Sequence, residues 1–249
     1  MKYGIQMYSL RDLASRDLEE AVRTVASLGY SYVEYAGFFG HPAEEVASWQ
    51  AKYGVECTST HTGWGEILPD KIEGTIAYHK TIGCKNIIIP GADLSDDEKI
   101  AGFVAAVNAA LPVIKEAGLT LGYHNHSREF ALRPDGRCVW DILAEKTDML
   151  FEIDTFWAWG AGRDPVAMMS AMKDRVRFIH IKDGLRGGKG RTLGKGEAPV
   201  REVRRRAIQL GMKMIVESET LTPDGPTEAA ECIGFLKKLD ASDPVTASI

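Results

Sequence analysis

The stretch Leu121-Gly-Tyr-His-Asn-His-Ser-Arg-Glu-Phe130 joins an apolar strand to a polar end. Up to Tyr123, apolar residues alternate with small or polar ones, which is typical of a β-strand with one buried face. His124 and His126 follow two residues apart, so their imidazoles point to the same face. Glu129 comes next in the loop and can fold back over that face. Such groups bind metals and move protons. Other strands of this chain also end in polar residues, and we predict both the fold and the function from that repeated pattern.

Seven further β-rich runs alternate with segments of helical period. The strands are expected at residues 3–9, 31–35, 55–60, 86–90, 149–154, 176–182 and 212–217. Helices are expected at 17–28, 42–52, 69–82, 95–117, 200–210 and 227–239, and one more ends near 146. Eight strand–helix units of about thirty residues predict one closed parallel (β/α)8 TIM barrel, spanning 1–249 as a single domain. The rival, an open doubly wound sheet, would carry a Gly-rich phosphate turn after its first strand, and Tyr8-Ser-Leu-Arg11 is not one.

Three local features carry expectations of their own. Pro112 lies inside the helix expected at 95–117, capped by Ser95, and predicts a kink or a break there. The loop 183–196 is Gly-rich and basic and follows the seventh strand, where barrels often bind phosphate, so either a phosphorylated substrate or a mobile lid is expected. The run Arg204-Arg-Arg206 lies on an outer helix and is expected to be a solvated surface.

Composition excludes several classes of protein. With 249 residues, of which 45% are hydrophobic and 26% charged, the chain can bury a sizeable core and shows no sign of disorder or of a membrane span. A net charge of −5 gives no electrostatic footprint for nucleic acid. The four cysteines form no C-x-x-C pair, which argues against a zinc knuckle or a disulfide framework. No secretory signal is expected at the start of the sequence, so a reduced, cytoplasmic setting fits best.

Polar residues gather where the predicted strands end. In a barrel these ends face one common mouth, where active sites lie. The residues are Gln6, Tyr8, Glu34, His61, His124, His126, Glu129, Asp154, His180, Lys182, Asp183, Glu217 and Glu219. Each has an ordinary explanation by itself, since Asp154 could cap a turn and Glu217 could pair with Lys182. Acidic and imidazole groups on four strands at one level nevertheless favour a shared site.

A divalent cation explains this convergence best, because unpaired buried charges cost several kcal/mol each. The predicted metal ligands are Glu129, Asp154, His180 and Glu217. An oxygen-rich set with one imidazole favours Mn²⁺, with Mg²⁺, Co²⁺ and Zn²⁺ as alternatives. His124, which stands directly at a strand end, is the alternative to Glu129 as the ligand from this part of the chain.

Four motifs then suggest a family. They are His124-Asn-His126 with Glu129-Phe130, the run Asp154-Thr-Phe-Trp-Ala-Trp-Gly-Ala-Gly-Arg-Asp-Pro165, His180-Ile-Lys-Asp-Gly184 with Leu193-Gly-Lys-Gly196, and Val216-Glu217. Together they resemble the xylose isomerase-like TIM-barrel superfamily. More narrowly, they are similar to its sugar (phosphate) isomerase/epimerase group, related to inosose dehydratase, the ketose 3-epimerases and endonuclease IV.

The resemblance implies one Mn²⁺-type site, with Asp154, His180 and Glu217 matching family ligands. Ketose 3-epimerases place a glutamate where this chain has His124, whereas the dehydratase-like branch looks closer to Glu129. Trp157 stands where epimerases and endonuclease IV use a histidine, which weakens a direct transfer of the 3-epimerase mechanism. The segment after the seventh strand lacks the Asp-x-His element of endonuclease IV, so no nucleic-acid substrate is expected. Family members often form dimers or tetramers, so the resemblance also implies a homo-oligomer.

Proton transfer next to a carbonyl of a polyhydroxylated substrate suits these groups. Glu217 and His124 are the predicted catalytic pair, one removing a proton and the other returning it. The predicted substrate contacts are His61, His126, Trp157, Lys182 and Asp183. The favoured function is a metal-dependent sugar isomerase or epimerase acting on a small-molecule keto-sugar. The alternatives are a lyase or dehydratase acting on 3-oxo-glycosides or inososes, and a barrel that binds sugars without catalysis.

Overall fold

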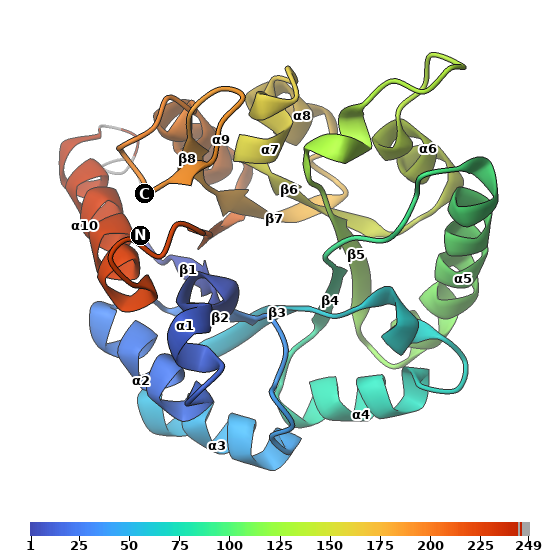
Figure 1. Cartoon of the computed structure of the whole chain (residues 1–249). Helices are drawn as coiled ribbons and strands as arrows, with labels where there is room; N and C mark the ends of the chain where they lie inside the picture. Colours follow the sequence, from blue (N-terminus) through green and yellow to red (C-terminus); the bar gives the residue numbers. More distant parts are fainter. Residues whose placement is uncertain (244, 246–249) are drawn as a thin grey trace.

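Eight parallel strands close into a barrel (Figure 1). The computed structural model describes residues 1–243 and 245. The strands are β1 (Gly4–Gln6), β2 (Tyr32–Tyr35), β3 (Glu56–His61), β4 (Asn86–Ile89), β5 (Thr120–His124), β6 (Leu150–Asp154), β7 (Val176–Ile181) and β10 (Lys213–Val216), in the order β1-β10-β7-β6-β5-β4-β3-β2. The barrel closes where Gly4 pairs with Tyr32 on one side and Ile215 on the other. The predicted (β/α)8 TIM barrel is confirmed.

Helices surround the strands as an outer ring (Figure 1). They are α2 (Leu18–Leu28), α3 (Ala43–Tyr53), α4 (Ile72–Thr81), α5 (Asp97–Glu116), α6 (Val139–Lys146), α8 (Pro165–Ala171), α9 (Val200–Leu210) and α10 (Gly225–Ser242). Shorter pieces lie in the loops, namely η1 (Met7–Leu10), α1 (Arg11–Ala14), η2 (Trp64–Ile67), η3 (Ser127–Phe130), α7 (Thr155–Gly160) and the strand pair β8 (Asp183–Gly184) and β9 (Gly190–Arg191). Among residues 1–243 and 245, no helix combines the length and apolarity needed to cross a membrane.

Local sequence signals set most helix ends. Asp17 caps α2 by accepting a hydrogen bond from the backbone N–H of Glu20, and Gly29 ends it in the left-handed conformation with φ of 93°. The cap of α5 is Asp96 rather than the predicted Ser95, because the Asp96 carboxylate reaches the N–H of Lys99. The choice between neighbouring polar residues therefore depends on which side chain points back along the helix.

Two expectations about helices need revision. The helix α5 runs unbroken through Pro112, so the break does not occur, and the alternative of a kink stays a prediction. Pro112 and Asn108, whose carbonyl loses its helical partner, both lie on the exposed side, where water can bond that carbonyl. The segment after Asp154, expected to be a loop, forms α7, because the Asp154 side chain caps its first turn. The consequence is that a site residue also sets the direction in which the chain leaves the barrel.

The barrel interior has an apolar floor beneath its polar mouth. Ile88, Phe178 and Ile215, from β4, β7 and β10, form a small cluster of their own. Phe178 lies two residues before His180 on β7, so the two side chains share the inward face, one level apart. Gly122 makes room for this packing, since a Cβ there would lie 2.8 Å from Ile88 Cδ1. The polar groups of the mouth therefore lie directly above a closely packed apolar layer of the barrel interior.

The expectation of a solvated arginine run was wrong for Arg204. This side chain is fully buried, and its guanidinium is paired with Asp240 and Asp243 on the C-terminal side of the chain. Its Nε also donates a hydrogen bond of 2.9 Å to the hydroxyl of Tyr3. Because α9 is amphipathic, one of three consecutive arginines had to face inward. Its burial is possible because the carboxylates of Asp240, in α10, and Asp243, directly after α10, pair with its charge.

Candidate metal centre and active site

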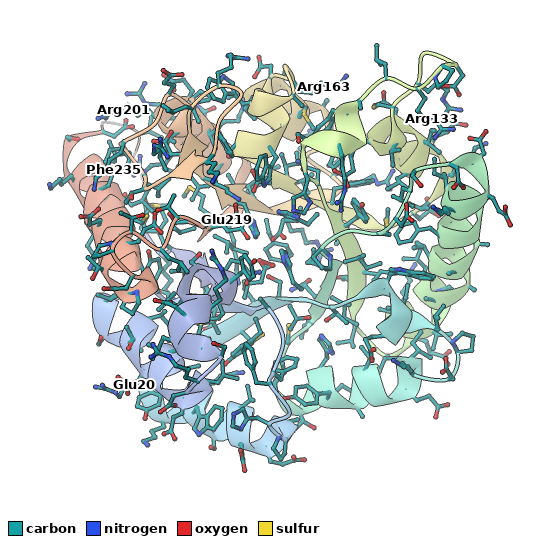
Figure 2. All side chains as sticks on the ribbon, in the orientation of Figure 1. Glu20, Arg133, Arg163, Arg201, Glu219 and Phe235 are labelled. Carbon is teal, nitrogen blue, oxygen red and sulfur yellow. The ribbon has the colours of Figure 1, made fainter. Side chains whose placement is uncertain are left out.

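The mouth of the barrel holds a cavity of about 400 Å³. Its lining residues come from the C-terminal ends of strands and the loops after them, and they are Tyr8, Ala36, Gly37, His61, Pro90, His124, His126, Glu217 and Glu219. Figure 2 shows Glu219 toward the centre of the ring, whereas Arg133 and Arg163 lie at its periphery. A cavity of this size accommodates a small polar molecule.

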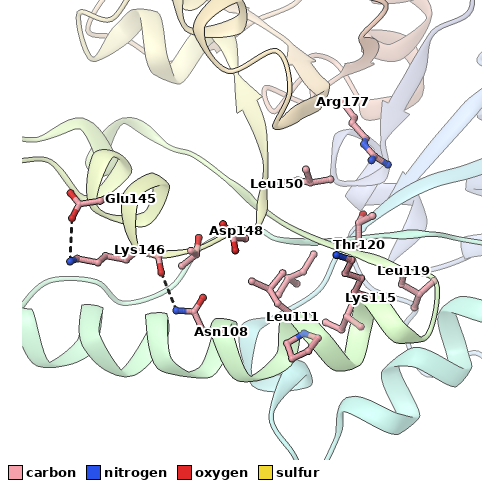
Figure 3. A pocket seen from close by; sticks show the side chains of 14 residues that line it. Asn108, Leu111, Lys115, Leu119, Thr120, Glu145, Lys146, Asp148, Leu150 and Arg177 are labelled. Carbon is pink, nitrogen blue, oxygen red and sulfur yellow. Dashed lines mark hydrogen bonds and ion pairs between the residues drawn. The ribbon is translucent and has the colours of Figure 1, made fainter.

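Another cavity, of about 760 Å³, lies at the opposite end of the barrel (Figure 3). It runs between α5 and the starts of β5 and β6. Three of its polar residues contact each other, since the Asn108 amide donates to the carbonyl of Lys146 and the Lys146 ammonium pairs with Glu145. The N-terminal face of such barrels serves stability rather than chemistry. The candidate site is therefore the mouth.

Four buried side chains converge at the mouth. They are His124, Asp154, His180 and Glu217, and one ligand atom from each lies within 4.8 Å of the others. His180 Nδ1 lies 3.1 Å from His124 Nε2 and 3.3 Å from Glu217 Oε2. Ligand atoms around a single ion with bonds of about 2.1 Å are roughly 3–4 Å apart. The spacing of this donor group, as we call these four residues, fits one divalent cation.

The two carboxylate oxygens of Asp154 have different surroundings: one caps the helix α7, and the other faces the donor group. Its Oδ1 accepts a hydrogen bond of 2.8 Å from the N–H of Trp157, and its backbone N–H and C=O are both held by the side chain of Asn125. Its Oδ2 is buried and accepts no hydrogen bond from any described residue. Burial raises the pKa of Asp154 above its ordinary value. A buried carboxylate oxygen without a hydrogen-bond donor is the feature that a bound cation would satisfy.

Lys182 supplies positive charge beside the donor group. Its Nζ lies 2.8 Å from Glu217 Oε2, 2.9 Å from Glu219 Oε2 and 3.5 Å from Asp154 Oδ2. Burial alone would lower the pKa of Lys182, but these carboxylates hold it above its ordinary value, so the side chain stays charged. Burial would likewise raise the pKa of Glu217, yet Lys182 and His180 hold it well below the usual range. The carboxylate of Glu217 is therefore ionised.

Trp157 packs against this lysine. The ammonium lies 4.8 Å from the centre of the indole ring, a cation–π contact. The indole Nε1 is buried and makes no hydrogen bond to any described residue. His126 lies nearby, with ring centres 6.0 Å apart, and its Nδ1 is likewise buried without a partner among the described residues. Of these two predicted substrate contacts, His126 lines the mouth cavity, and Trp157 lies behind it against Lys182.

Glu129 lies elsewhere, contrary to the prediction that it is a metal ligand. The 3₁₀ turn η3 folds its carboxylate back onto its own strand end, where Oε2 accepts a hydrogen bond of 2.8 Å from the N–H of His126. Its Oε1 accepts from the Tyr123 hydroxyl and from Arg128 Nε, at 3.0 Å each. The donor group contains His124 in its place. The geometry therefore favours His124, the alternative that the sequence left open.

Asp183 also differs from its predicted role as a substrate contact. Its Oδ1 accepts hydrogen bonds from the N–H groups of Gly184 and Ala198, and its Oδ2 accepts from those of Gly194 and Gly196. The carboxylate thus lies inside the Gly-rich loop and holds it together. These four amide groups are no longer free for a phosphate, so the expected phosphate site at this loop is not supported.

Two carboxylates that were given no role in the predicted site lie beneath the donor group. Glu34 Oε2 lies 2.7 Å from His180 Nε2, and Glu152 Oε2 lies 3.1 Å from His61 Nε2. Both carboxylates are fully buried. Their signal in the sequence was weak: Glu152 precedes Asp154 by two residues and so shares its inward face, but nothing local links Glu34 to His180, 146 positions away.

Glu34 is expected to orient His180. A carboxylate that accepts the Nε2–H of a histidine fixes its tautomer and leaves Nδ1 free as a metal ligand. Glu34→Gln should therefore weaken metal affinity about 10- to 100-fold. Isothermal titration of chelator-treated protein with Mn²⁺ measures this. Glu129→Gln is the matched control, since it changes a buried glutamate outside the donor group, and equal affinities for the two variants would contradict the assignment.

The comparisons with known proteins agree with this architecture. A family model described as Xylose isomerase-like TIM barrel matches residues 22–239. Inosose dehydratase from Geobacillus kaustophilus (strain HTA426) is 24% identical over an alignment of 199 residues. The match covers 66% of this chain and 61% of that protein, which is less than two thirds of the relative.

Solved structures give the same picture. A sugar phosphate isomerase/epimerase from Parabacteroides distasonis ATCC 8503 superimposes with a TM-score of 0.82 and 26% identity, covering 95% of this chain and 98% of the other. A D-allulose 3-epimerase from Methylomonas sp. gives a TM-score of 0.71 at 13% identity, covering 96% and 97%, and shows likeness of fold alone. With the family match spanning most of the barrel, the chain belongs to the xylose isomerase-like TIM-barrel family.

Proposed function

We propose that the protein is a divalent-metal-dependent sugar isomerase or epimerase that transfers a proton next to the carbonyl of a keto-sugar or related polyol. The observation that carries the proposal is the buried donor group at the mouth cavity, in which Asp154 Oδ2 accepts no hydrogen bond from any described residue. Membership of a family with sugar isomerases, epimerases and dehydratases among the structural and sequence relatives supports an enzymatic role.

The residues present fit a divalent cation. His124, Asp154, His180 and Glu217 would hold it, giving two imidazole and two carboxylate donors. With two nitrogens the set is less oxygen-rich than the one predicted from sequence, which favours Mn²⁺, Co²⁺ or Zn²⁺ over Mg²⁺. Bound there, the ion would polarise a substrate carbonyl and its neighbouring hydroxyl, which stabilises the negative charge left when the α-proton is removed.

Glu217 is the proposed base. It is ionised, lines the mouth and has a second oxygen available when Oε2 faces the donor group. His124 was the predicted partner, but its Nε2 points at the donor group and its ring is buried. His126 lines the same cavity and lies outside the donor group, so it is better placed to exchange a proton with substrate. The Lys182 ammonium would stabilise the substrate oxygen on which negative charge develops.

A lyase or dehydratase is the second candidate, for two reasons. The chain resembles inosose dehydratase in sequence, and Trp157 replaces the histidine that the epimerase resemblance would require. In an elimination, the same base removes the α-proton, and His126, which lines the mouth cavity, is the candidate to protonate the departing oxygen. The chemistry up to loss of the proton is common to both candidates.

Incubation with substrate panels in D₂O should separate these functions. Protein loaded with Mn²⁺ is incubated with ketoses, 3-oxo-glycosides and inososes, and products are examined by mass spectrometry. Incorporation of deuterium at carbon with otherwise unchanged mass indicates isomerisation or epimerisation, whereas loss of water or of an aglycone indicates elimination. If chelated, metal-free protein binds sugars as well as loaded protein does and neither turns them over, the barrel is a sugar-binding module and the proposal fails.

A further inference from the structure

A second cavity, of about 710 Å³, adjoins the mouth. It lies over the loops that follow β4 and β5, and Pro90 lines both cavities, so the two are neighbours at that residue. The mouth cavity is large enough for one sugar ring, and the adjoining space is larger still. A substrate bound at the mouth could therefore continue past Pro90 into this neighbouring cavity, which we call the side cavity.

Arg128 lies in the turn η3 and lines the side cavity. Its Nε donates to Glu129 at 3.0 Å, which fixes the guanidinium, while its side chain is 61% exposed. A Cβ at Gly91 would lie 2.5 Å from Arg128 Nη2, so the glycine next to Pro90 leaves the space in which this arginine lies. The same carboxylate of Glu129 accepts the N–H of His126, which lines the mouth. One short turn thus presents His126 to one cavity and Arg128 to the other.

Arg133 supplies an unsatisfied donor. Its Nη2 is paired with Asp97, but its Nε is buried and has no hydrogen-bond partner among the described residues. A buried N–H without an acceptor destabilises the structure relative to one that is hydrogen-bonded. An oxygen of a bound molecule would remove that cost. Beside it Leu132 is 74% exposed and gives the side cavity an apolar surface.

The cavity on the other flank of the mouth has no arginine among its lining residues. This cavity, of about 400 Å³, shares Gly37 and His61 with the mouth. Its buried histidine, His79, is already bonded through both ring nitrogens, to the Thr60 hydroxyl and the Thr75 carbonyl, at 2.7 Å each. Of the two flanking cavities, the side cavity is therefore the one with guanidinium groups, those of Arg128 and Arg133.

We propose that the substrate is larger than one sugar ring and that a second hydroxylated ring occupies the side cavity, as in a disaccharide ending in a keto-sugar. This inference rests on the proposed function, since the reacting ring must bind at the mouth. Guanidinium N–H groups of Arg128 and Arg133 donate to hydroxyl oxygens of the second ring. The C–H face of that ring packs on Leu132, as apolar surface does in sugar sites.

Paired sugars test the proposal. Mn²⁺-loaded protein is titrated calorimetrically with fructose and with three glucosyl-fructose disaccharides of different linkage, namely turanose, leucrose and isomaltulose. The best disaccharide should bind at least about tenfold more tightly than fructose, as expected for one or two hydrogen bonds to charged groups. In Arg128→Gln and in Arg133→Gln this ratio should fall to about one. Arg186→Gln, which alters a rim arginine stacked on Trp159 instead, should keep the ratio.

The outcomes separate the two proposals. Equal affinity for fructose and every disaccharide in the unaltered protein, or a ratio that survives in both arginine variants with unchanged melting temperatures, overturns the side cavity as a substrate site and leaves the proposed function standing. If none of the four sugars binds although the protein holds metal, the proposed keto-sugar chemistry fails, and the second ring fails with it.

Discussion

Asp154→Asn should lose both bound metal and turnover. The substitution keeps the cap on α7, because an amide oxygen can still accept the N–H of Trp157, but it removes the charge from the oxygen that faces the donor group. Loss of the ion removes several kcal/mol of transition-state stabilisation, so a fall of about a thousandfold or more is expected. Metal content by mass spectrometry should drop from about one equivalent to nearly none, and Glu217→Gln should behave in the same way.

The control for this experiment is Glu129→Gln. Glu129 is also a buried carboxylate, but its oxygens accept hydrogen bonds from Tyr123, His126 and Arg128. We expect this variant to retain about one equivalent of metal. If instead it loses the ion while Asp154→Asn keeps it, the ligand set predicted from sequence was right and the donor group is not the metal site.

Asp183→Ala should destabilise the fold strongly. The Asp183 carboxylate accepts four backbone hydrogen bonds across residues 184–198, and the alanine variant leaves those N–H groups without an acceptor. Hydrogen bonds to a charged group contribute about 1.5–3 kcal/mol each, and allowing for partial rescue by water the expected loss is on the order of 5 kcal/mol. Urea unfolding followed by circular dichroism measures it.

Gly196 shows how tightly the loop closes on this carboxylate. A Cβ at Gly196 would lie 2.2 Å from Asp183 Oδ1, so no other residue fits without displacing the loop. Asp96→Ala is the comparison, because it removes one exposed helix cap and should cost only about 1 kcal/mol. Similar losses for the two variants would show that the loop amides find other partners, and Asp183 would then be free for the substrate contact predicted from sequence.

The eight strands were predictable because each has a local signal. Alternating or continuous apolar runs mark strands, and Gly29 and Gly211 mark helix ends by their left-handed backbone. The parallel arrangement follows from strand–helix alternation, and it brings the ends of all strands to one mouth. His180 and Glu217 could therefore be assigned to one site from sequence, although they lie on different strands.

The metal ligand contributed by the turn after β5 could not be predicted from local sequence signals. Both His124 and Glu129 have suitable chemistry, and the choice depends on whether η3 turns the glutamate inward or back onto the backbone. The capping interaction with His126 decides this, and its geometry is set by a few backbone angles that composition does not reveal. The predicted roles of Trp157 and Lys182 as substrate contacts remain proposals, and the structure shows the two side chains in contact with each other.

By itself, the sequence determined the barrel and the level at which its polar groups meet, because periodicity and alternation are properties of neighbouring residues. Only the tertiary structure decided that Glu34 faces His180, that Asp183 binds its own loop and that Arg204 is buried against Asp240. These pairings join residues far apart in the chain, or depend on the path of a loop. Packing and the need to satisfy buried charges select them, and neither leaves a periodic trace in the sequence.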